Sequence, residues 1–255
     1  MAEQSIIRVE HLTIGYGGKA LLDELNFEVR HGEVFAILGG SGSGKSTLLK
    51  HMIGLFPPMH GHIWLDGIDI ATAEGAARLS ALRRIGVAYQ SGALFGSMTL
   101  AQNVRLPLEE YTELPDEAIE LIAHTKLDLV GLKDFAESLP AEVSGGMQKR
   151  AAIARAMALD PAILFLDEPS AGLDPVTSAG LDQLILRLKR GLAVTFVVVT
   201  HELPSIFTIA DRVIMLDPHV RGIVAQGRPQ ELRENSDNPA VRQFFNRQAG
   251  ALETA

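Results

Sequence analysis

The sequence predicts an α/β fold in which a strand-rich core is interrupted by a helical segment. Two observations support this prediction. Short apolar runs bounded by glycine-rich turns recur at both ends of the 255-residue chain, whereas residues 94–159 show helical spacing without a strand pattern. With 47% hydrophobic residues, the chain is long and apolar enough to fill such a core.

The first third of the chain predicts strands joined by tight turns. Asp66-Gly67 is one such turn signal, and a glycine-rich loop followed by helical spacing over residues 46–53 separates two of the apolar runs. This order indicates a strand, a loop and then a helix. The runs that predict strands are residues 6–9, 25–29, 34–38 and 62–65.

The remainder of the chain predicts helices first and then alternating strands and helices. Pro115 opens one helix of the middle segment, and Ser144 caps another that is rich in Ala and Arg. Beyond Pro161 we expect a return to the βαβ pattern. The predicted strands there are residues 162–166, 193–199 and 213–216, and the predicted helices are residues 175–190, 204–209 and 239–248.

Composition excludes several classes of function. The formal net charge of −8 argues against a nucleic-acid surface as the main site of action. The absence of cysteine excludes disulfides, thiolate zinc sites, iron–sulfur clusters and a cysteine nucleophile. The acidic and polar first ten residues do not fit a secretory signal, and no apolar stretch is long enough to span a membrane.

A glycine-rich motif carries the clearest chemistry. Residues 39–46 fit GxxxxGK followed by Ser or Thr, and they lie between a predicted strand and a predicted helix. Such glycines allow successive backbone N–H groups to point at phosphate oxygens, and the helix end adds positive charge. Lys45 supplies a full charge at the β- and γ-phosphates, and Ser46 places a hydroxyl where Mg²⁺ binds. The competing interpretation is a surface turn, which the flanking elements disfavour.

A second motif, which is acidic, supplies the other groups that hydrolysis of a phosphate chain needs. Residues 163–166 predict an apolar strand that ends in Asp167, and Glu168 follows directly. We expect Asp167 to bind the metal through water and Glu168 to polarise the water that attacks the γ-phosphate. Alone, these two carboxylates could also belong to a solvated turn.

A second anion site is predicted at Ser144-Gly145-Gly146. The serine caps a helix that begins with glycine amides, so the positive helix end is open to an anion. One phosphate chain rarely needs two such sites, and we therefore consider that this one completes the site of a neighbouring subunit.

The order of these motifs resembles the ATP-binding subunits of ABC transporters along almost the whole chain. The resemblance implies a P-loop NTPase (RecA-like) α/β core with an N-terminal antiparallel β subdomain and an inserted helical subdomain. It divides the chain into a discontinuous core of residues 1–93 and 156–235, a helical subdomain of residues 94–155 and a C-terminal tail of residues 236–255.

The same resemblance implies the remaining site residues. Tyr16 falls at the position that stacks on adenine, Gln90 at the Q-loop glutamine that binds the metal, and His201 at the switch histidine. Asp174 ends the D-loop. Glu168, His201, Lys45 and Gln90 are the implied catalytic residues, and Ser46, Gln90 and Asp167 are the implied Mg²⁺ ligands. The implied ATP contacts are Tyr16, Gly39, Gly40, Ser41, Gly42, Ser43, Gly44, Lys45, Ser46, Thr47, Ser144, Gly145, Gly146 and Asp174.

The resemblance identifies Ser144-Gly145-Gly146-Met147-Gln148, with Val143 before it, as the signature motif of this family. This motif departs from the usual pattern at two positions. Val143 replaces a leucine and Met147 replaces a glutamine, whereas Ser144 and Gly146 are kept. Together with residues 90–95 and the segment 236–244, Met147 makes the chain resemble the Mla group of phospholipid-transport ATPases, which serve MCE proteins.

This narrower resemblance implies partners and a location. Two copies of the chain would sandwich two ATP molecules, and a membrane permease would dock near Gln90 and the helical subdomain. An MCE lipid-binding protein and a small STAS-domain protein would complete the complex at the cytoplasmic face of the inner membrane. No nucleic acid is expected as a partner.

Two other functions remain open from the sequence. The chain could power an importer of another solute, because the transported molecule never touches this subunit. It could also be a soluble ATP-switched scaffold, although it has one ATP-binding unit and no sustained heptad pattern.

Overall fold

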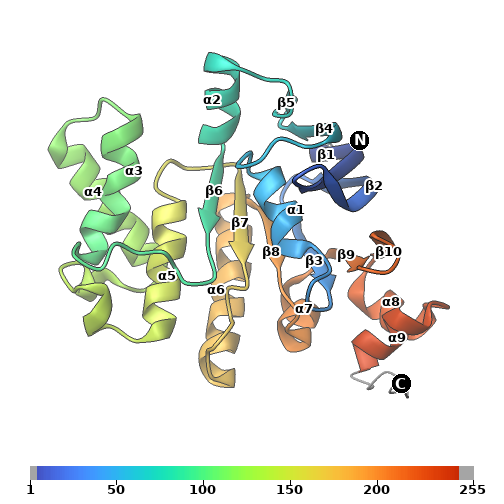
Figure 1. The fold of residues 1–255 in the computed structure, drawn as a ribbon. Helices are drawn as coiled ribbons and strands as arrows, with labels where there is room; N and C mark the ends of the chain where they lie inside the picture. Colours follow the sequence, from blue (N-terminus) through green and yellow to red (C-terminus); the bar gives the residue numbers. More distant parts are fainter. Residues whose placement is uncertain (1–4, 247–255) are drawn as a thin grey trace. The chain divides into compact units, whose positions relative to one another are not determined.

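The computed structural model describes residues 5–246 of the chain, which divide into two compact units (Figure 1). Unit 1 combines residues 1–73 with residues 199–255, and unit 2 consists of residues 74–198. Unit 1 contains β1 (Ser5–Tyr16), β2 (Lys19–Arg30), β3 (Val34–Gly39), α1 (Lys45–Met52), β4 (His60–Leu65), β5 (Ile68–Asp69), α7 (Leu203–Ile209), β9 (Arg212–Asp217), β10 (Gly222–Gly227), α8 (Pro229–Asn235) and α9 (Pro239–Asn246).

The second set of elements belongs to unit 2. It contains α2 (Gly75–Arg83), β6 (Ile85–Ala88), α3 (Leu100–Tyr111), α4 (Asp116–Leu129), the short 3₁₀ helices η1 (Lys133–Phe135) and η2 (Pro140–Glu142), α5 (Gly145–Ala156), β7 (Ile163–Asp167), α6 (Pro175–Leu192) and all but the last residue of β8 (Thr195–Val199).

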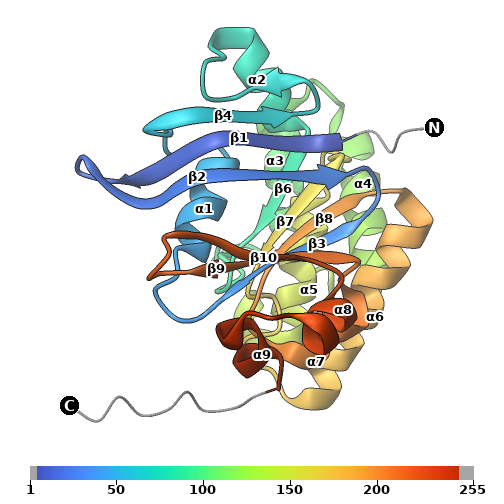
Figure 2. The ribbon, with the colours of Figure 1, turned by 90° about the vertical axis from the view of Figure 1, so that its right-hand side faces the viewer.

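Two groups of strands build unit 1. The antiparallel sheet has the order β2-β1-β4-β5, and β1 pairs with β2 from Ser5 to Tyr16 across the turn at Gly17-Gly18 (Figure 2). In β2, alternate residues from Leu25 to Val29 are buried, as expected for a strand with one solvated face, whereas β1 also buries consecutive residues at Ile6-Ile7 and Leu12–Ile14. The second group has the order β10-β9-β3, in which β3 runs parallel to β9.

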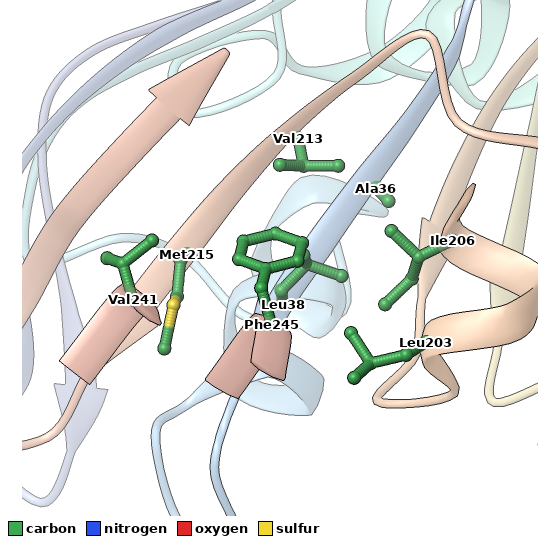
Figure 3. Packing of buried hydrophobic residues seen from close by; sticks show 8 residues of the cluster. All are labelled: Ala36, Leu38, Leu203, Ile206, Val213, Met215, Val241 and Phe245. Atoms are coloured by element: carbon green, nitrogen blue, oxygen red, sulfur yellow. The ribbon is translucent and has the colours of Figure 1, made fainter. Parts of the chain in front are cut away.

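A hydrophobic cluster joins the second group of strands to the C-terminal helices of unit 1. The Phe245 ring of α9 lies over Leu38 of β3, and Met215 lies beside Val241 (Figure 3). Phe245 is 3% exposed, and its ring centroid is 5.8 Å from that of Phe207 in α7. Because β3 carries the glycine-rich loop at its end, this cluster supports the strand that positions the loop.

Unit 2 combines three strands with a group of packed helices. Its strands have the order β8-β7-β6, and β6 pairs in parallel with β7. Helices α3, α4 and α5 pack together, as Figure 1 shows. The fully buried Asn103 on α3 accepts a hydrogen bond from Phe95 N and donates to the carbonyls of Phe95, Met98 and Thr99, so one side chain fixes the turn before the helix.

The fold prediction is confirmed for all seven predicted strands, and residues 94–159 contain no strand. The predicted helices at residues 46–53, 175–190 and 204–209 appear as α1, α6 and α7. The helix predicted at residues 239–248 is α9, whose last two predicted residues lie outside the described part. The sequence prediction missed α2, β5, β6, β10 and α8, and it underestimated the lengths of β1 and β2.

Within the described residues, no helix combines the length and apolarity needed to cross a membrane.

Replacing Phe245 with Ala is expected to lower the free energy of unfolding by roughly 3 kcal/mol, because it removes a buried ring. This value is near the lower end of the range for buried Phe→Ala changes, since a short helix near the chain end can separate from the core before the rest of the protein unfolds. Chemical denaturation monitored by circular dichroism measures this change. The matched variant Phe244→Ala removes a ring that is only partly buried and should cost less. Equal losses for the two variants would contradict the role given to Phe245.

Candidate functional site

The glycine-rich loop forms the end of β3 and the start of α1 in unit 1. All six residues of β3 are buried, so the strand is fixed in the core up to Gly39. Gly39 has φ +150°, and a Cβ atom there would lie 2.6 Å from Leu216 O and 2.4 Å from Ser43 Oγ. Gly42 and Gly44 have φ values of +75° and +93°. The turn therefore requires glycine for conformation at three positions and for space at Gly39.

The loop offers several donors to an anion. Helix α1 begins at Lys45 without a side-chain cap, so its first backbone N–H groups are available to a ligand. Ser43 is 1% exposed, and its Oγ has no hydrogen-bond partner among the described residues. Lys45 Nζ donates to Gly39 O at 2.9 Å and to Gly40 O at 3.0 Å. These groups fit a phosphate chain.

A hollow of about 240 Å³ lies at this loop and gives it space for a ligand. Besides the apolar side chain of Leu21, its wall is made by the second half of the motif and the residue that follows it. The predicted contacts from Gly42 to Thr47 therefore come together in one place. These lining residues are Gly42, Ser43, Gly44, Lys45, Ser46 and Thr47.

Tyr16 ends β1 as part of a small aromatic cluster in the same unit. Its ring centroid is 5.5 Å from that of Phe56 in an edge-on arrangement and 6.2 Å from that of His51. The side chain is 47% exposed, so one side of the ring is available for stacking. His201, the predicted switch residue, is also exposed in unit 1, directly after the buried Thr200, whose N–H donates to Ile37 O of β3 at 3.3 Å.

The two predicted acidic residues lie at the end of β7 in unit 2. Strand residues 163–166 are fully buried, and Asp167 is only partly covered. Glu168 is 8% exposed and has φ +46°, in the left-handed region that few non-glycine residues adopt. Such a conformation costs about 1–3 kcal/mol and persists only where the surroundings hold it in place.

The predicted second anion site lies at the start of α5. Ser144 is the N-cap of this helix, and its Oγ accepts a hydrogen bond from Met147 N at 3.3 Å. Ser144 and Gly145 are exposed. A Cβ atom on Gly146 would lie 2.4 Å from Thr177 Cγ2 of α6, so this position is restricted to glycine by close helix packing.

A hollow of about 610 Å³ in unit 2 brings three predicted site residues together. Gln90, Gly145 and Asp167 all line it, and the side chain of Lys149 shares the same wall. Tyr89 lies there as well, where partial burial and the charge of Asp167 raise the pKa of its hydroxyl. Acidic and basic groups therefore meet at the ends of β6 and β7.

Sequence reasoning missed two cations of α5 that hold the turn after β6. Lys149 Nζ donates to the carbonyl of Gln90 and, at 3.5 Å, to that of Glu168. The guanidinium of Arg155 donates to Gly92 O at 2.9 Å and to Ala93 O at 2.7 Å. The available signal was the presence of basic residues on a helix that otherwise buries mostly small apolar side chains.

The predicted D-loop residue Asp174 has a structural role at the start of α6. Its carboxylate accepts hydrogen bonds from Val176 N and Thr177 N, both at 3.0 Å, and from the Thr177 hydroxyl. The bonds from Thr177 lower the pKa of this carboxyl. Asp174 is exposed, so its N-cap role leaves one side of the residue open to solvent.

Unit 1 thus carries the phosphate-binding loop, Tyr16 and His201, and unit 2 carries the acidic and signature residues. The members from unit 2 are Gln90, Ser144, Gly145, Gly146, Asp167, Glu168 and Asp174.

Comparison with known proteins gives the family. The ABC transporter family pattern matches residues 22–171. A probable ribonucleotide transport ATP-binding protein, mkl of Mycobacterium leprae, is 41% identical over 94% of this chain and 68% of its own length. The intermembrane phospholipid transport system ATP-binding protein MlaF of Escherichia coli is 40% identical over 96% of this chain and 91% of its own.

Solved structures agree with this result. The dimeric ATP-binding cassette MJ0796, in a post-hydrolysis state bound to ADP and phosphate, superposes with a TM-score of 0.77 at 30% identity. The superposition covers 87% of this chain and 98% of that one. The glycine-rich loop at the uncapped end of α1, the carboxylates at the end of β7 and these similarities lead to one conclusion: the chain belongs to the ABC transporter family as an ATP-binding subunit with ATPase activity.

Proposed function

We propose that the chain hydrolyses ATP to power phospholipid transport between membranes as part of an MCE-type system. The similarity to MlaF supports this cargo, because it extends over 96% of this chain and 91% of that protein. The mkl relative is named for ribonucleotide transport, but this chain spans only 68% of it. The match in length therefore favours phospholipid transport over ribonucleotide transport as the function of this chain.

ATP binding in this proposal begins at the phosphate-binding loop. The backbone N–H groups of residues 39–47 surround the phosphates, and Lys45 turns from its own loop carbonyls to the β- and γ-phosphates. Tyr16 stacks on the adenine ring with its exposed face. Ser144, Gly145 and Gly146 contact the ATP held by a second copy of the chain, and Asp174 lies beside that nucleotide.

Magnesium is the expected metal because the proposed ligands are all oxygen donors. Ser46 offers a hydroxyl, Gln90 an amide oxygen and Asp167 a carboxylate, which are ligands that Mg²⁺ prefers. When bound, Mg²⁺ neutralises charge on the phosphate oxygens.

Hydrolysis is assigned to three side chains around the attacking water. Glu168 accepts a hydrogen bond from this water and takes its proton, and His201 orients the γ-phosphate. Lys45 stabilises the charge that develops on the γ-phosphate oxygens.

The remaining parts of the proposal concern partners and location. Two copies of the chain form the ATP-bound dimer, in keeping with the dimeric MJ0796 cassette. A permease docks near Gln90 and the helical group α3–α5, and an MCE lipid-binding protein and a small STAS-domain protein join the complex. The chain would then act at the cytoplasmic face of the inner membrane as a peripheral subunit.

Replacing Glu168 with Gln is expected to lower ATP turnover by about 10²–10⁴-fold, because the amide cannot accept the proton of the attacking water. ATP binding should persist, and the variant should accumulate as an ATP-bound dimer. Steady-state phosphate release and size-exclusion chromatography with ATP measure these two effects. Glu142→Gln, at an exposed position in η2, is the matched control. An unchanged turnover number in the Glu168 variant would remove this residue from the role of base.

The proposed cargo is tested by purifying tagged Glu168→Gln protein with ATP from detergent-solubilised native membranes. We expect a permease, an MCE protein and phospholipid to copurify, as identified by mass spectrometry. A permease that arrives with a different solute-binding protein would contradict the phospholipid assignment. Recovery without any membrane protein would instead favour the soluble scaffold.

A further inference from the structure

Lys149 connects three segments of unit 2 that the sequence separates widely. It lies in the second turn of α5, the helix that begins directly after Ser144. Its ammonium group reaches the backbone carbonyl of Gln90, which follows β6, and that of Glu168, which follows β7. A single side chain therefore holds the turn at Gln90 and the residue proposed as the base against the same helix.

The Lys149 ammonium lies in a partly buried environment, so its hydrogen bonds to the two carbonyls replace contacts with water. Burial lowers the pKa of the Lys149 ammonium, while the neighbouring carboxylates of Asp167 and Glu168 act in the opposite direction. A half-buried ammonium needs hydrogen-bond acceptors, and the two carbonyls supply them. Loss of the ammonium would remove this donor from both carbonyl oxygens, and the Glu168 carbonyl would keep its hydrogen bond from Ala171 N at 3.2 Å.

The backbone of Glu168 gives the contact a direct consequence for the site. Its left-handed conformation, with φ +46°, is unfavourable for a glutamate and must be held by neighbouring groups. Rotation about the N–Cα bond, which would return Glu168 to an ordinary conformation, also moves its carbonyl group. The donors on this carbonyl, Lys149 Nζ and Ala171 N, therefore oppose that rotation. Such a rotation would also move the carboxylate, because the side chain begins at the same Cα atom.

We propose that Lys149 is a positioning residue that fixes the positions of the Glu168 backbone and the Gln90 turn relative to the start of α5. This inference rests on the proposed role of Glu168 as the base. A shift of α5 at Ser144 would then change the positions of Gln90 and Glu168 together, so the signature helix would control hydrolysis within the same chain as well as contacting the ATP of a second copy.

The first test compares three variants of the full-length chain. Lys149→Met keeps most of the aliphatic stem and removes the donor, whereas Lys149→Arg keeps a cationic donor. Lys133→Met is the matched control, because Lys133 is exposed on η1 in the same unit. We expect Lys149→Met to lower kcat for ATP about tenfold or more with KM within about twofold, since small displacements of a catalytic group have large effects on rate. Lys149→Arg should recover most of kcat.

A double variant separates this inference from the proposed role of Glu168. If Lys149 acts through Glu168, Lys149→Met should lower single-turnover hydrolysis in the wild-type background but add little to Glu168→Gln. Multiplicative losses in the double variant would overturn the inference while leaving Glu168 as the base. An active Glu168→Gln protein would instead contradict the base assignment itself.

Two further outcomes decide against Lys149 as a positioning residue. Activity of Lys149→Met equal to that of Lys133→Met would show that the two carbonyl contacts are dispensable. A rise in KM without a change in kcat would assign Lys149 to nucleotide binding. If Lys149→Met does not fold, Lys149→Arg is compared with Lys149→Gln, whose shorter side chain should lower kcat more than the arginine does.

Discussion

The end of β3 can accommodate only a glycine, and the phosphate-binding loop depends on this constraint. At Gly39 the backbone of β9 approaches so closely that a Cβ atom would lie 2.6 Å from Leu216 O. The parallel pairing of β3 with β9 thus fixes where the strand ends and where the chain must turn. Because Gly42 and Gly44 adopt positive φ values, the N–H groups of the loop can converge on one anion rather than pair along a strand. The same packing that closes the core of unit 1 therefore shapes its binding loop.

In unit 2, charged groups must be held at the ends of buried strands. Strands β6 and β7 are too short to place Gln90 and Glu168 by their own pairing. Helix α5 supplies the missing constraints through Lys149 and Arg155, which donate to backbone carbonyls rather than to carboxylates. The two cations thereby satisfy backbone acceptors that the turns would otherwise expose.

The sequence predicted much of the fold and the residue types of the site, but not the contacts that hold them. Motifs such as residues 39–46 predict local geometry, because three of their glycines adopt positive φ values and their order fixes a strand, a loop and a helix. The strand β6 escaped prediction, since its four residues, Ile-Gly-Val-Ala, include a glycine and an alanine, which are uncommon in strands. The hydrogen bonds of Lys149 and the left-handed backbone of Glu168 depend on tertiary packing, which no local pattern encodes. The proposed division at residues 93–94 and 155–156 stays a prediction.

The packing of α9 has a consequence for how this chain can be shortened or fused. Val241 and Phe245 cover Leu38 and Met215 within unit 1 (Figure 3). A protein cut after Asn235 would lack Val241 and Phe245 and would expose Leu38 and Met215 to water. An uncovered apolar patch of this kind promotes association between molecules. Reporter fusions and shortened versions of the chain should therefore begin or end beyond Asn246, or self-association of the shortened protein will be mistaken for the ATP-dependent dimer.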